Sequence, residues 1–152
     1  MNTASEQTRD RRVARVLLAD AGLATRLTLK FILSTAGYSV SGVATAAEAV
    51  GKLDTGEYQL VLADLRAESA DAGRQVLAYA RRKAFRPATA LLASDLSETG
   101  AAGEGQTEDA DARRSVHISH ENISSFLSGV AELISRRADR RMMQALAKAT
   151  VN

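Results

Sequence analysis

Two aspartates stand where apolar runs of strand length end, and they are the residues best suited to do chemistry. Asp20 closes the apolar run 16–19, and Asp64 closes the run 58–63. In a parallel sheet, the carboxyl ends of the strands meet at one edge, where ligands gather. Two carboxylates at that edge repel each other and require a cation, either a metal ion or a basic side chain. The competing interpretation is that Asp64 only caps the turn after its strand.

The elements that would position these aspartates alternate between strands and helices. Strands are predicted at residues 16–20, 38–43, 58–64, 88–93 and 115–118, and helices at 23–36, 46–50, 73–83 and from about residue 121 onward. The continuous apolar runs are typical of strands buried on both faces. The alternation predicts an α/β fold, a flavodoxin-like doubly wound five-stranded parallel sheet with strand order 2-1-3-4-5.

Composition divides the chain into one domain and three segments of different character. Residues 1–14 are polar and without periodicity, which predicts a mobile N-terminal arm. Residues 15–135 form the domain. Within it, residues 95–115 are acidic and carry Leu96 as their only large apolar side chain, so we expect a mobile loop. Residues 136–152 alternate arginines with apolar residues, which predicts a basic helical extension; a solvated tail is the alternative.

Several classes of protein are disfavoured by composition. The chain has no cysteine, so it holds neither disulfides nor thiolate metal sites. No apolar run approaches the roughly 20 residues that span a bilayer, and we expect a cytoplasmic protein without a membrane segment. The aromatic content of 4% offers little for stacking nucleic-acid bases. His117 and His120 lack a third ligand nearby in the sequence, so a metal pair is not expected there.

The order of these features resembles the receiver domain of two-component response regulators. Three segments carry the resemblance, namely 15–20, 58–66 and 87–94, and it covers residues 15–134. The resemblance implies that Asp64 is the phosphoacceptor of a histidine kinase. It also implies a magnesium ion held by acidic residues after the first strand, of which Asp20 is one.

The chain departs from the receiver pattern at three positions. Ala21 stands where a second acidic residue holds the metal, Leu92 where Thr or Ser binds a phosphoryl oxygen, and Ser119 where Lys is usual. Phosphoryl transfer depends on cations spread over the phosphoryl oxygens, so these losses weaken the switch chemistry. We therefore expect magnesium at Asp20 and Asp64 to be weakly bound or absent.

Arg66 is the predicted counter-charge of the depleted acidic pocket. It follows Asp64 by two residues, where the chain leaves its strand, and a guanidinium can bridge carboxylates with its planar fork of donors. The alternative is that Arg66 points to solvent while water screens the pair. If Arg66 occupies the pocket, phosphorylation of Asp64 should be slow.

The resemblance favours a stand-alone receiver-like domain in phosphorelay signal transduction, acting by protein–protein interaction and without enzymatic turnover. Its expected partner is a histidine kinase or another phosphorelay protein. The alternative is a phosphorylation-independent pseudo-receiver that serves as an interaction or dimerisation module. In either case, a partner or a second copy is expected at the first helix, where Leu27 and Phe31 lie off the core stripe, or at the C-terminal helix. Nucleic acid bound to the basic extension is a weaker hypothesis.

Overall fold

A five-stranded parallel sheet forms the centre of the computed structural model, which describes residues 13–93 and 116–151. The strands are β1 (Arg15–Asp20), β2 (Ser39–Val43), β3 (Leu60–Asp64), β4 (Ala88–Ala93) and β5 (His117–Ser119). Their order is β2-β1-β3-β4-β5, and every neighbouring pair is parallel. The predicted fold class and strand order are therefore confirmed. The predicted acidic loop and nearly all of the predicted N-terminal arm lie outside the described residues.

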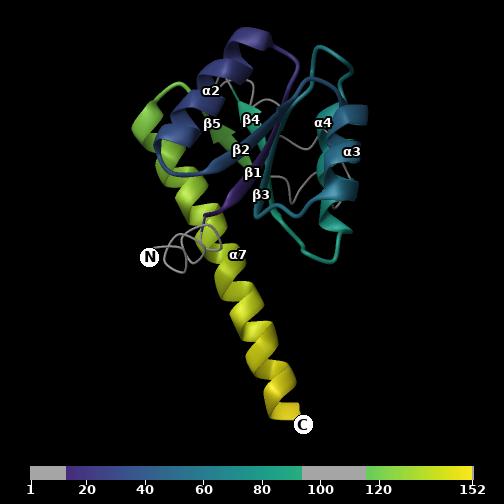
Figure 1. Ribbon diagram of the computed structural model, residues 1–152, viewed down its shortest axis with the longest axis vertical. Coiled ribbons are helices and arrows are strands. Elements are labelled where there is room, and N and C mark those ends of the chain that lie inside the picture. Colours follow the sequence, from purple (N-terminus) through teal and green to yellow (C-terminus); the bar gives the residue numbers. More distant parts are fainter. Residues whose placement is uncertain (1–12, 94–115, 152) are drawn as a thin grey trace, which may run out of the picture.

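Four helices cover the two faces of the sheet within the described part of the chain (Figure 1). They are α2 (Leu23–Thr35), α3 (Ala46–Thr55), α4 (Ala72–Arg81) and α7 (Ile123–Val151). Side chains alternate along each strand, so Leu17 and Val61 pack on the side of α3 and α4. Leu18 and Leu62 pack on the opposite side, against α2 and the first half of α7. This double burial explains why β1 is apolar from Val16 to Ala19, and β3 from Leu60 to Ala63, before their terminal aspartates.

Local sequence features determine where α3 begins and where α2 ends. The Thr45 hydroxyl accepts a hydrogen bond from the Glu48 backbone N–H at 3.1 Å, and the Glu48 carboxylate accepts from the Ala44 N–H at 3.0 Å. These two hydrogen bonds form a capping arrangement at the start of α3. Gly37 has a φ of 105°, a left-handed conformation that ends α2 without the steric cost of a side chain.

The last strand differs slightly from the prediction. It was expected at 115–118, yet β5 runs from His117 to Ser119, because Leu92 pairs with Ile118 and Ala93 with Ser119. Ile118 is the one buried residue of β5, and it centres the strand on the core. The C-terminal edge of the sheet therefore extends to Ser119, directly before His120.

The final helix has an inner half that packs and an outer half that projects. Asn122 caps its start by accepting the Ser125 N–H at 3.0 Å, and Phe126 and Val130 are fully buried against the sheet. The helix continues past Ser135 and extends away from the sheet (Figure 1). In the described ranges, no helix combines the length and apolar character required to cross a membrane.

Candidate functional site

Strands β1 and β3 bring Asp20 and Asp64 to the same edge of the sheet. The two residues are direct register partners, at the last position of each strand. The Ala21 N–H donates to the Asp64 backbone oxygen at 3.1 Å, which extends the pairing one step beyond the strands. Because strands in a sheet are about 4.8 Å apart, both carboxylates open into one small region.

Asp20 is a buried carboxylate that is only half satisfied. The residue is 3% exposed, and its Oδ1 accepts the Gly22 N–H at 2.9 Å. Its Oδ2 is buried without a hydrogen-bond partner in the described structure. Arg26 donates to the Asp20 backbone oxygen at 2.7 Å and leaves the carboxylate unpaired.

The environment disfavours the ionised form of Asp20. Burial raises the pKa of this carboxyl, and the neighbouring charge of Asp64 raises it further. The hydrogen bond from Gly22 acts in the opposite direction, as do the nearby His120 and Arg26. Because the pKa is raised on balance, the ionised Asp20 carries an electrostatic cost that a cation in the site would relieve.

Arg66 forms a two-point ion pair with Asp64. Its Nε lies 2.9 Å from Asp64 Oδ1, and its Nη2 lies 3.0 Å from Oδ2. The Asp64 side chain is 16% exposed and the Arg66 side chain is 49% exposed. The geometry is the strong bidentate form, but water screens so exposed a guanidinium, so the pair is worth about 1 kcal/mol or less.

The pocket around these residues has a volume of about 520 Å³. Its lining comes from the ends of β1 and β3, the start of α2 and the residue after β5, and comprises Asp20, Ala21, Gly22, Thr25, Asp64, Arg66, Ala67 and His120. Sequence reasoning missed His120 as a member of this pocket. It follows the last strand and therefore reaches the same C-terminal edge, a signal that the sequence already contained.

The three positions that depart from the receiver pattern supply no charge to the site. Leu92 is 4% exposed and belongs to the core beneath α2 and α7. The Ser119 hydroxyl accepts the Glu121 N–H at 3.3 Å. Ala21 lines the pocket but offers only a methyl group. In the described structure, the basic side chains that line the pocket are Arg66 and His120.

The donor set does not fit a tightly held magnesium ion. Magnesium requires oxygen ligands in near-ideal octahedral array. Both carboxylate oxygens of Asp64 are engaged by Arg66, and Asp20 contributes one unpartnered oxygen. Across the described residues, no group of three or more His, Cys, Asp or Glu side chains is arranged to hold a metal.

Comparisons with known proteins identify the fold. No protein-family model matches the chain, and no curated protein does. The chain is similar to a CheY-like response regulator receiver domain from Methanospirillum hungatei JF-1, with 20% identity, a TM-score of 0.67, and coverage of 84% of this chain and 98% of that one. It is also similar to a structure of adenylate cyclase from Rhodopirellula baltica, with 20% identity, a TM-score of 0.69, and coverage of 90% and 98%.

A third similar protein is response regulator TrrA from Thermotoga maritima, solved with Mg²⁺ and BeF, with 22% identity, a TM-score of 0.62, and coverage of 80% of this chain and 99% of that one. TrrA has also been solved in complex with histidine kinase ThkA; that structure matches at 22% identity with a TM-score of 0.61, covering 80% and 98%. At these identities the likeness concerns the fold, and this chain has the fold of response-regulator receiver domains.

Proposed function

We propose that the protein is a receiver-like signalling domain that acts through protein–protein contacts, with Asp64 as a phosphoryl acceptor restrained by Arg66. The observation that carries this proposal is the register of Asp20 and Asp64 at the C-terminal edge of a receiver fold, in an open pocket. That edge is where open α/β sheets bind ligands.

The chemistry of acceptance requires one free oxygen on Asp64. A carboxylate oxygen attacks phosphorus in line, and the donor's bond to phosphorus breaks as the new O–P bond forms. The donor, an imidazole or a small carboxylate, leaves with the electron pair, and Asp64 becomes an acyl phosphate. Because Arg66 engages both oxygens, the guanidinium must move aside before attack. Its 49% exposure leaves room for that movement.

Acceptance should be slow for a second reason. The transferring phosphoryl group is stabilised by cations and donors around its equatorial oxygens. Ala21, Leu92 and Ser119 offer no charge at the positions where the receiver pattern places such groups. The pocket therefore relies on Arg66 and His120, and Arg66 is already committed to the acceptor itself.

A partner that delivers phosphoryl groups would approach over α2. Gly22 and Thr25, at the start of this helix, line the pocket. Beside them, three apolar side chains are exposed: Leu23 by 61%, Leu27 by 56% and Phe31 by 72%. Contiguous exposed apolar groups mark protein interaction sites. The histidine-kinase complex of TrrA, a protein of the same fold, supports a kinase as the class of partner.

The second candidate function is an interaction module that never receives a phosphoryl group. The observation that favours it is the Arg66–Asp64 pair, which neutralises the acceptor within the chain itself. In this case Asp64 and Arg66 have only a structural role, and a phosphodonor does not change the affinity for the partner.

Intact mass measurement distinguishes the two functions. The protein is incubated with a small phosphodonor such as acetyl phosphate and with magnesium, beside Asp64→Asn as the control. A receiver function predicts addition of one phosphoryl group to the wild type and none to the variant. No addition to the wild type after prolonged incubation favours the phosphorylation-independent module, and equal addition to both proteins excludes Asp64 as the acceptor.

A further inference from the structure

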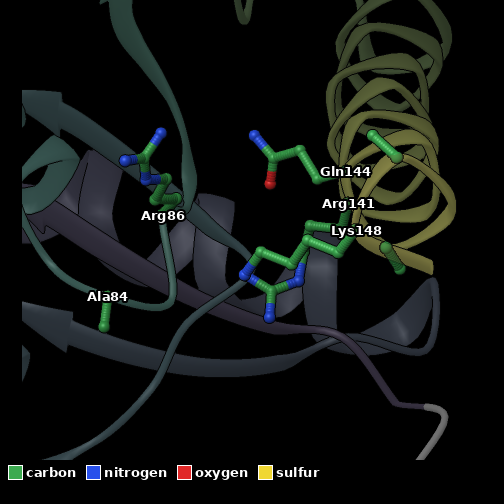
Figure 2. Close-up of a pocket in the computed structure, with 7 residues that line it drawn as sticks. Ala84, Arg86, Arg141, Gln144 and Lys148 are labelled. Carbon is green, nitrogen blue, oxygen red and sulfur yellow. The ribbon is translucent and has the colours of Figure 1, made fainter. Parts of the chain in front are cut away.

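A second pocket lies between the α4–β4 connection and the outer half of α7, and Figure 2 shows it in close-up. Its volume is about 580 Å³, within the range of roughly 300 to 1,000 Å³ that is usual for small-molecule sites. Arg86 extends from the connection on one side, while Arg141, Gln144 and Lys148 extend from α7 on the other (Figure 2). The remaining lining is Ala84, Ala145 and Ala147.

The connection that carries Arg86 has a strained backbone. Arg86 has a φ of 39°, and it is the only residue other than glycine with a positive φ among those described. A left-handed conformation costs about 1 to 2 kcal/mol for such a residue, and the proline that follows it favours an extended conformation instead. Strain of this kind persists only where the surroundings hold it, and it is concentrated at functional sites.

Two arginines of α7 hold the strained connection in place. Arg137 donates from Nη2 to the Phe85 carbonyl at 2.7 Å and from Nε to the Arg86 carbonyl at 3.1 Å. Arg141 adds a bond from Nη1 to the Phe85 carbonyl at 3.1 Å. Both sides of the pocket are therefore fixed to each other, and Arg86 is presented from a defined position.

No described carboxylate neutralises the positive charge at the pocket. Among the described residues, Arg86, Arg141 and Lys148 form no ion pair with a carboxylate, and no acidic side chain lines the pocket. Burial lowers the pKa of Arg137, and the neighbouring charges of Arg141 and Arg140 lower it further, although Glu57 opposes them. An anion in the pocket would relieve this repulsion.

We propose that this pocket binds the phosphate groups of a small phosphorylated molecule. Arg86 and Arg141 supply planar forks of donors that match phosphate oxygens, Lys148 supplies a compact charge, and Gln144 an uncharged donor. The three alanines leave an apolar surface for the rest of the molecule. The site is concave, and none of its described lining residues is an aromatic on which a base could stack, so a small molecule fits it better than a single-stranded nucleic acid.

The test is an NMR titration of the full-length protein with inorganic pyrophosphate and, in a second arm, with metal-free ATP. Pyrophosphate should shift the backbone amides of Arg86, Gln144 and Lys148. Arg86→Gln and Lys148→Gln should each weaken binding by about fivefold or more. Arg136→Gln is the matched control, because it removes the same charge from the same helix but pairs with Glu132 outside the pocket; it should change affinity by less than about twofold.

Four outcomes would overturn the proposal. The first is the absence of any shift in the wild type at millimolar pyrophosphate and ATP. The second is an equal loss of affinity in Arg136→Gln, which would mean diffuse attraction to a basic helix. The third is a set of shifts centred on Asp64 and Arg66 instead of this pocket. The fourth, from a further arm, is binding of a short oligonucleotide when both small anions fail to bind.

Discussion

The candidate site contains one paired carboxylate and one unpaired carboxylate. Asp64 is neutralised by Arg66, two residues further along the chain, whereas Asp20 retains a buried oxygen without a hydrogen-bond partner. The paired residue is the more exposed of the two, so its ion pair can open at little cost. The unpaired residue, Asp20, stays buried, so the folded state retains the free-energy cost of a buried carboxylate oxygen without a partner. These two contrasting residues lead to separate predictions.

Replacement of Arg66 should strengthen magnesium binding. Arg66→Ala frees both oxygens of Asp64 beside the unpartnered oxygen of Asp20, so two carboxylates become available to one cation. We expect the dissociation constant for magnesium to fall roughly fivefold, which corresponds to the approximately 1 kcal/mol of an exposed ion pair. Calorimetric titration of the wild type and the variant measures this. Arg82→Ala, an exposed arginine beyond α4, is the control. Tight binding in the wild type with no gain in the variant would contradict the prediction.

Replacement of Asp20 should stabilise the protein at neutral pH. The folded-state pKa of Asp20 is raised above 3.8, so its penalty is fully present at pH values above the raised pKa and vanishes below 3.8. Asp20→Asn should therefore raise the free energy of unfolding by roughly 1 kcal/mol at pH 7. The gain should shrink toward zero as the pH falls through the raised pKa.

Denaturant unfolding of the wild type and Asp20→Asn between pH 3 and pH 7 measures this difference in the free energy of unfolding. The pH range covers roughly the values over which carboxyl groups titrate. The control is Asp71→Asn, whose side chain is 71% exposed and whose effect should stay within about 0.5 kcal/mol. A difference between the wild type and Asp20→Asn that does not depend on pH would show that the charge of Asp20 is not the cause.

The secondary-structure elements were predictable because most of them bury apolar side chains in simple periods. Leu17, Leu18, Val61 and Leu62 alternate between two cores, which only a strand covered on both faces allows. The positions of Asp20 and Asp64 follow from the same runs. The place of His120 in the pocket was missed, because its role depends on where β5 ends and that strand is only three residues long. The hydrogen bonds from Arg137 to the α4–β4 connection join residues that are distant in sequence, so no local sequence pattern indicates them.

Two glycines in different elements should respond in opposite ways to substitution. Gly129 of α7 lies so close to β5 that an added Cβ would stand 2.6 Å from Ile118 Cδ1. Gly129→Val should therefore destabilise the protein by about 1 to 3 kcal/mol through overpacking against the Ile118 side chain. Gly51 of α3 has nothing within 4 Å of such a Cβ, so Gly51→Ala should stabilise by about 0.5 to 1 kcal/mol through helix propensity. Unfolding midpoints in urea give both values, and a neutral Gly129→Val would mean that α7 does not pack closely on β5.

At the scale of the whole molecule, α7 joins a packed domain to a projecting segment. Its inner half completes the core through Phe126 and Val130, while Met142, Met143 and Leu146 are 57% to 66% exposed on the outer half. Flexible methionine side chains suit adaptable binding surfaces. The receiver fold does not require this outer half for its core, so we expect it to serve association.

Deletion of residues 136–152 should leave the domain folded and change its association. The truncated protein keeps the core but loses the contacts of Arg137 and Arg141 with the α4–β4 connection, which should cost about 1 to 2 kcal/mol of stability. Light scattering and pull-down experiments should show a changed oligomeric state or a lost partner. A full-length variant with Met142, Met143 and Leu146 replaced by Gln should reproduce the change while keeping both arginines. Identical association in all three proteins would mean that the outer half is inert.

We propose above all that Asp64 is a phosphoryl acceptor restrained by Arg66. The most direct test is a time course of Asp64 phosphorylation by acetyl phosphate, followed by intact mass, in the wild type, Arg66→Ala and the control Arg82→Ala. We predict that Arg66→Ala accepts the phosphoryl group about fivefold faster than the wild type, because the competing ion pair of about 1 kcal/mol is gone, and that Arg82→Ala does not differ from the wild type. An Arg66→Ala rate equal to or below that of the wild type would contradict the account.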